Sequence, residues 1–134
     1  MSEHKNILQE PALSYESFQE GYYELAGQAI SKTYIKSIIQ LTRMNVPDFI
    51  DLIPISIDTY KRKNIFNPIV TEKVLQIEEV YRKGLDAFGP GFYDWFNSPN
   101  TYLGGVKPQK LLSNSFGVRQ LLELLGRMEY GILA

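Results

Sequence analysis

Residues Pro99–Ala134 read PNTYLGGVKPQKLLSNSFGVRQLLELLGRMEYGILA, and this stretch decides the fold of the C-terminal part of the chain. Gly104-Gly105 predicts a sharp turn, and Pro108 follows at a position that suits the first turn of a helix, where a missing N–H does no harm. A second helix is predicted from Asn114 onward, because apolar residues recur there at helical spacing. These residues are Phe116, Val118, Leu121, Leu122, Leu125 and Met128. The stretch therefore predicts two helices, the second with one broad apolar face.

Further helices are predicted upstream, each after a residue that can cap its N-terminus. These caps are Ser31, Asn45, Ser56 and Asn67. The helix after Asn67 runs to Gly89, and a short aromatic helix follows over residues 91–97. Residues 1–12 read as a loose tail, and residues 14–20 as a short helix. No strand pattern or repeat is visible, so the predicted fold class is all-α.

The aromatic helix contains Phe92, Tyr93, Trp95 and Phe96. Such rings could form a stacking platform for nucleic-acid bases. Their helical spacing favours a place in the core instead, since each ring removes a large apolar area from water.

Composition excludes several classes of protein. The 134 residues include no cysteine, which excludes disulfides and thiol catalysis, and the single histidine, His4, lies in the expected tail. No catalytic residue, metal site or cofactor is expected, because the carboxylates have no histidine or phosphate-binding loop around them. The sequence has no apolar run of membrane-spanning length and no signal peptide, so we expect a cytoplasmic protein without membrane contact.

The net charge of −1 conceals an uneven distribution. Residues 31–66 hold six basic and three acidic residues, a net charge of +3. This segment also has the layout of a helix-turn-helix: a helix, a short helix, a break at Pro54, and a third helix that ends in basic residues. Because few phosphates would be neutralised, DNA binding should be weak in the monomer.

The third helix of this segment carries the residues expected to contact DNA. Side chains at its N-terminal end would reach base edges, and those at its C-terminal end would bind phosphates. The candidates are Ser56, Asp58, Thr59, Lys61, Arg62 and Lys63. Ile57 and Tyr60 are expected to face the core. In the alternative, the three helices only support the C-terminal domain, and the lysines are a solvated face.

The order of the C-terminal motifs resembles the C-terminal domain of Xre/MbcA/ParS-type antitoxins, the partners of RES-domain toxins. The resemblance extends over roughly residues 30 to 134. Its motifs are Trp95-Phe96, Pro99-Asn100, Leu103-Gly104-Gly105, Pro108 to Leu112, Gly117 and Gly126-Arg127-Met128-Glu129-Tyr130-Gly131.

The resemblance implies an antitoxin that neutralises a RES-domain toxin, an NAD-consuming enzyme, by laying its C-terminal tail across the active site. The toxin-binding residues would be Arg127, Tyr130, Gly131, Ile132, Leu133 and Ala134. It also implies binding to operator DNA and repression of the chain's own operon. In the alternative, Arg127 only stabilises a helix end and the tail folds back.

The expected organisation is an N-terminal segment (1–30), a helix-turn-helix lobe (31–66) and a toxin-binding, dimerising domain (67–134). A homodimer is expected because the apolar face of the last helix exceeds what so short a chain can bury. Two other functions remain open: a stand-alone transcription regulator with a dimerising C-terminal domain, and an interaction module that binds neither DNA nor toxin.

Overall fold

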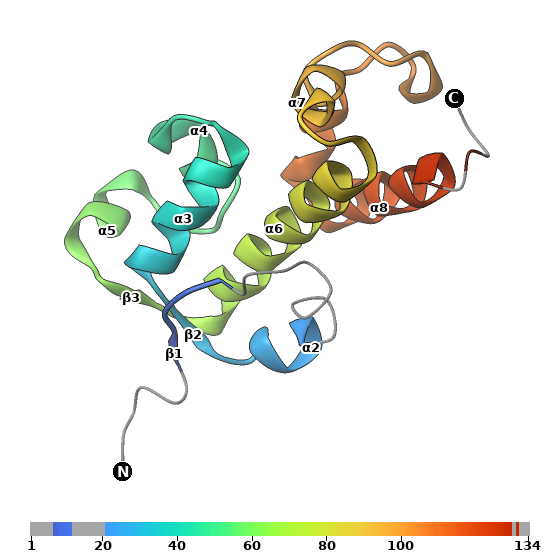
Figure 1. Cartoon of the computed structure of the whole chain (residues 1–134). Helices are drawn as coiled ribbons and strands as arrows, with labels where there is room; N and C mark the ends of the chain where they lie inside the picture. The colour runs from blue at the N-terminus through green and yellow to red at the C-terminus, as the bar shows by residue number, and fades with distance from the viewer. Residues whose placement is uncertain (1–6, 12–20, 130, 132–134) are drawn as a thin grey trace. The chain divides into compact units, whose positions relative to one another are not determined.

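A computed structural model describes residues 7–11, 21–129 and 131 of the chain (Figure 1). It is mainly α-helical, which confirms the expected fold class. The α-helices are α2 (Tyr22–Leu25), α3 (Lys32–Thr42), α4 (Val46–Ile50), α5 (Ile57–Arg62), α6 (Pro68–Phe88), α7 (Gly91–Phe96) and α8 (Ser115–Glu129). Two 3-10 helices, η2 (Thr101–Leu103) and η3 (Pro108–Ser113), lie between α7 and α8.

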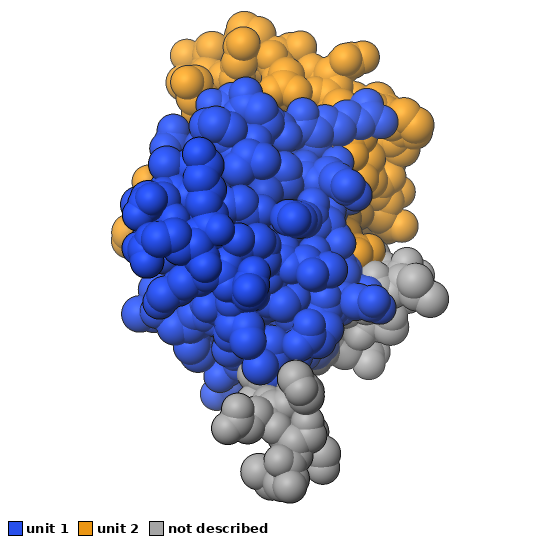
Figure 2. Space-filling model, turned by 90° about the vertical axis from the view of Figure 1, so that its left-hand side faces the viewer, with its two compact units in different colours: residues 1–78 blue, residues 79–134 orange. Residues whose placement is uncertain are grey.

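The chain forms two compact units, Met1–Glu78 and Glu79–Ala134, which Figure 2 colours separately. The division falls within α6, so this helix contributes its first half to the first unit and its second half to the second. Each unit has buried apolar side chains of its own.

The predicted N-caps are confirmed. The side chains of Ser31, Asn45 and Ser56 each accept a hydrogen bond from the backbone N–H three residues later, at 2.9 to 3.1 Å. The Asn67 side chain accepts from the N–H groups of Ile69 and Val70. These bonds satisfy donors that an uncapped helix start leaves free, which explains why the helices begin where the sequence predicts.

Three short strands, β1 (Ile7–Leu8), β2 (Ala29–Ser31) and β3 (Ile65–Phe66), correct the expectation of no strands. β2 pairs in parallel with β1 and antiparallel with β3, with Ile30 opposite both Leu8 and Phe66. Part of the expected tail is thus a strand. The helix expected over residues 14–20 lies outside the described residues.

The first unit contains a buried polar contact between α3 and α6. The hydroxyl of Tyr34 donates to the carboxylate of Glu78, and both residues are buried. The hydroxyl of Thr71 on α6 also donates to the Gln28 carbonyl at 2.6 Å, just before β2. Because buried polar groups are costly when unpaired, these bonds fix where α6 lies against α3 and β2.

The second unit is built on the aromatic residues of α6 and α7. Phe92 and Phe96 are fully buried and stack at 4.7 Å between ring centroids, and the Tyr81 ring meets both edge to face. The expected place in the core is therefore confirmed for Phe92 and Phe96, whereas Tyr93 and Trp95 are half-buried. Gly84 makes this packing possible, because a Cβ there would overlap the Phe92 ring.

α8 packs closely against η3 in the same unit. A Cβ on Gly117 would overlap the backbone carbonyl of Leu111, so only glycine allows this approach. The helix expected after Pro108 is the 3-10 helix η3, and Asn114 then adopts an extended conformation and caps α8 through a bond to the Gly117 N–H.

Most of the apolar face of α8 is buried within its own unit. This corrects the expectation that the face is too large for the chain to bury, on which the predicted dimer was based. Leu121 and Leu125 are fully buried within the unit, and Leu122 is half-buried. Phe116 is 76% exposed. The unpartnered apolar surface of α8 is therefore much smaller than the spacing suggests.

We expect Gly117→Ala to lower the free energy of unfolding by about 1 to 3 kcal/mol, because the methyl group must push η3 away from α8. Gly126→Ala is the matched control: a Cβ there meets only the Lys83 amine at 3.6 Å. This control should be neutral, or stabilising by up to about 1 kcal/mol through better helix propensity. Urea unfolding measures both. Equal stability of the two variants would contradict the close packing at Gly117.

Candidate DNA- and protein-binding surfaces

The N-terminal end of α5 is held by a pair of hydroxyl groups. The Ser56 Oγ accepts from the Thr59 N–H and donates to the Thr59 Oγ1, both at 3.0 Å. Ser56 is exposed and Thr59 is half-buried. The two hydroxyl groups share one hydrogen bond, so one hydroxyl proton of the pair remains to donate to a ligand.

The charged residues of α5 are exposed, but they are not equally available to bind a ligand. The Arg62 Nε donates to the Asp58 carboxylate at 3.0 Å, one helical turn away. Arg62 keeps its terminal nitrogens, but the carboxylate offsets its charge. Lys61 and Lys63 are also exposed. The structure thus brings the six candidate DNA-binding residues together on and beside one short helix.

The two apolar positions of α5 differ. Tyr60 is buried, as expected, whereas Ile57 is 37% exposed, which corrects the expectation that it faces the core. The Tyr60 ring stacks on Phe66 of β3 at 6.1 Å between centroids. Burial raises the pKa of the Tyr60 hydroxyl, which has no hydrogen-bond partner within the described part of the chain.

Lys32 is a residue that the sequence did not single out for this surface. Its Nζ donates to the Lys61 carbonyl near the C-terminal end of α5, at 3.0 Å, and lies 5.1 Å from the centroid of the Tyr60 ring. A cation at this end of a helix satisfies a free carbonyl and is favoured by the helix dipole. Lys32 therefore attaches α5 to the start of α3, a contact between residues 29 positions apart that no local pattern predicts.

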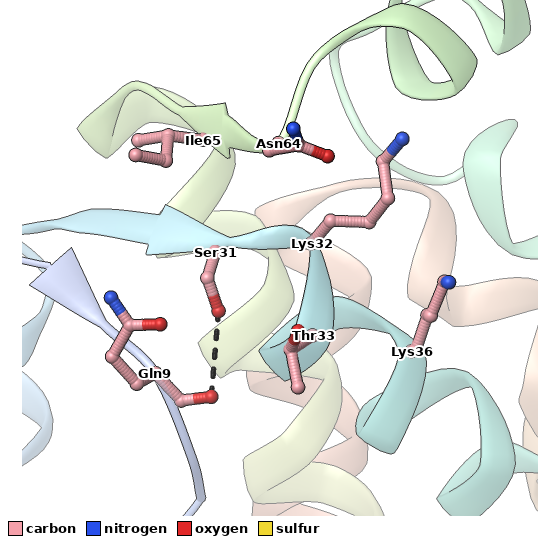
Figure 3. Close-up of a pocket in the computed structure, with 7 residues that line it drawn as sticks. All are labelled: Gln9, Ser31, Lys32, Thr33, Lys36, Asn64 and Ile65. Carbon is pink, nitrogen blue, oxygen red and sulfur yellow. Dashed lines mark hydrogen bonds between the residues drawn. The ribbon is translucent and has the colours of Figure 1, made fainter.

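A hollow of about 310 Å³ lies beside the start of α3 (Figure 3). The Ser31 Oγ donates to the Gln9 carbonyl there at 3.4 Å, and the Lys32 N–H donates to the Asn64 carbonyl at 2.8 Å. The lining residues are Gln9, Ser31, Lys32, Thr33, Lys36, Asn64 and Ile65. Two of these are lysines, so basic side chains extend from α5 onto α3.

Two of the candidate toxin-binding residues, Arg127 and Gly131, are described, and they lie at the end of α8. Arg127 is exposed in the last turn, and Gly131 ends the helix with a φ of +71° and an N–H that donates to the Met128 carbonyl. A glycine is favoured at such a left-handed C-terminal position. Tyr130, Ile132, Leu133 and Ala134 lie outside the described residues.

Residues 88–131 match the family model of the antitoxin Xre/MbcA/ParS C-terminal toxin-binding domain. The C-terminal part of this chain is therefore similar to that domain. The match covers α7, η2, η3 and α8, and it confirms the resemblance found in the motifs over these residues. It supports an antitoxin of a toxin–antitoxin pair. No curated protein matches the chain.

The described residues contain no group of three or more histidine and acidic side chains that could hold a metal ion. Among the helices that the structure describes, none has both the length and the apolar character needed to cross a membrane.

We expect Ser56→Ala to destabilise α5 by about 1 kcal/mol, because the variant loses the side-chain cap on the Thr59 N–H. Ser56→Asp should restore most of this loss, since aspartate is an equally good N-cap. Urea unfolding compares the three proteins. If alanine and aspartate variants unfold alike, the Ser56 cap does not stabilise α5.

Proposed function

We propose that this chain neutralises a RES-domain toxin, an enzyme that consumes NAD or transfers a group from it, and represses its own operon. The observation that carries the proposal is the toxin-binding domain at residues 88–131. The C-terminal motifs of this sequence resemble those of antitoxins whose partners are RES-domain toxins. In this proposal the chain's own role is binding, and the catalytic chemistry belongs to the toxin.

The proposed inhibitory segment begins at Arg127 and continues through Tyr130, Gly131, Ile132, Leu133 and Ala134. Two features support it. Arg127 is exposed, and a guanidinium can bind a carboxylate through two parallel hydrogen bonds. Among the residues that the structure describes, the buried core residues of the second unit all precede Glu129.

The tail is tested by deleting Tyr130–Ala134. We expect a folded protein that no longer protects cells from the toxin encoded in the adjacent reading frame. Circular dichroism checks the fold, and cellular NAD levels after toxin induction measure protection. Full protection by the shortened protein, with NAD preserved, would show that neutralisation uses another surface. Failure of the full-length chain to co-purify with the toxin would instead favour the stand-alone regulator.

We propose residues 31–66 as a DNA-binding lobe in which α5 contacts the operator, and residues 67–134 as the toxin-binding and dimerising part. In this proposal exposed Lys61, Arg62 and Lys63 contact phosphates, while Ser56, Asp58 and Thr59 read base edges. The Asp58–Arg62 ion pair lowers the positive charge that a single DNA-binding lobe offers to phosphates. A homodimer would double the contacts, and Phe116, 76% exposed on α8, is an apolar residue available to form it.

The ion pair on α5 yields a specific prediction. Asp58→Asn should strengthen binding to promoter DNA and steepen its salt dependence, because it removes a carboxylate and leaves Arg62 free to neutralise a phosphate. Glu72→Gln, an equal change of charge at an exposed position of α6, is the control and should have little effect. Fluorescence anisotropy at several salt concentrations measures both. Equal effects of the two variants would indicate general electrostatics rather than contact through α5.

A further inference from the structure

A groove of about 270 Å³ lies between η2 and α8 in the second unit. Its lining residues are Tyr102, Leu103, Gln120, Glu123, Leu124 and Arg127. All six fall within the residues that match the toxin-binding domain. Pockets for small molecules usually occupy about 300 to 1,000 Å³, so this groove suits one or two protein side chains better than a cofactor.

The loop that carries η2 is closed by its own hydrogen bonds. The Asn100 side chain accepts from the Tyr102 N–H at 2.8 Å, and the Asn100 and Val106 backbones form an isolated bridge. Gly104 and Gly105 have φ angles of +69° and +84°, which glycine adopts without strain. The Pro-Asn and Leu-Gly-Gly motifs therefore build a defined turn.

This turn keeps Tyr102 at the surface, where the side chain is 57% exposed. The backbone bonds of the loop, rather than burial of the ring, fix the position of η2. A tyrosine supplies a large apolar area at low cost in conformational entropy, and tyrosine and arginine are enriched among the residues that dominate protein interfaces. Tyr102 and Arg127 line the same groove.

The structure shows no ion pair between Glu123 and Arg127, two described residues of α8. They are four residues apart on α8 with the acid first, which is the favourable order for pairing. Asp58 and Arg62 have the same spacing and order on α5 and pair at 3.0 Å. Within the described part of the chain, Glu123 and Arg127 do not form such a pair, so both charges remain available to a partner.

We propose that the η2–α8 groove binds the toxin by receiving one amphipathic side chain, whose apolar part packs on Tyr102 and Leu103 between two charged groups of the toxin. A carboxylate of the toxin pairs with Arg127, and a basic group pairs with Glu123. The proposal rests on the proposed antitoxin function and adds a docking site that shares only Arg127 with the tail segment, so Tyr102→Ala tests the groove alone. The groove supplies affinity, whereas the tail blocks the toxin's active site.

The test measures binding of the full-length chain to the purified toxin from the adjacent reading frame, by isothermal titration calorimetry. Tyr102→Ala and Arg127→Ala should each weaken binding by at least roughly thirtyfold, as expected for central interface residues. Two controls remove the same side-chain types elsewhere: Tyr23→Ala, in the first unit, and Arg119→Ala, on α8 but outside the groove. Both should bind within about twofold of the unmodified protein.

A second measurement uses the unmodified protein, in case Tyr102→Ala fails to fold. Amide hydrogen exchange should slow across residues 100–106 and 120–127 when the toxin binds. Unchanged exchange there, or groove variants that bind as tightly as the controls, would overturn the groove while leaving the antitoxin function intact. Absence of any binding by the unmodified chain would overturn the antitoxin function and the groove with it.

Discussion

The close approach of α8 to η3 at Gly117 is the constraint on which the second unit depends. Because no side chain intervenes, the Leu111 backbone lies against α8. Leu112 on η3 and Leu121 and Leu125 on α8 are then fully buried. The loop that precedes η3 carries Tyr102 and Leu103, so the groove they form with α8 depends on this contact. The absence of a side chain at Gly117 thus affects both the packing of the core and the position of the proposed toxin-binding groove.

In the first unit, α5 depends on contacts made outside its own six residues. A helix of this length is unstable alone, because it forms too few backbone hydrogen bonds to offset the free-energy cost of nucleation. The Ser56 cap holds its N-terminal end, Lys32 binds a carbonyl near its C-terminal end, and Tyr60 stacks on Phe66. The helix proposed to contact DNA is therefore fixed by α3 and β3, and substitutions at those positions would act on DNA binding indirectly.

The features that the sequence predicted are those decided by neighbouring residues. The caps at Ser31 and Ser56 and the end of α6 at Gly89 depend on a few adjacent positions, which is why they were predictable. The strands were not predicted, because each has two or three residues, too few to alternate, and their partners lie far away in the chain. The groove was missed for the same reason: its two walls come from separate segments, and only the fold brings Tyr102 beside Arg127.

The pairs Asp58–Arg62 and Glu123–Arg127 show why spacing alone does not assign a role to a charge. On α5 the carboxylate holds Arg62 and lowers the charge that the helix can offer to phosphates. On α8 the same arrangement leaves both groups without an ion pair to any described residue, beside the exposed Tyr102. An exposed ion pair contributes little to stability, so either outcome costs the fold almost nothing. The difference lies in binding: paired charges must separate before they bind a ligand, whereas unpaired charges bind without that cost. By this argument, the second unit is better prepared for tight binding to a protein than α5 is for binding DNA.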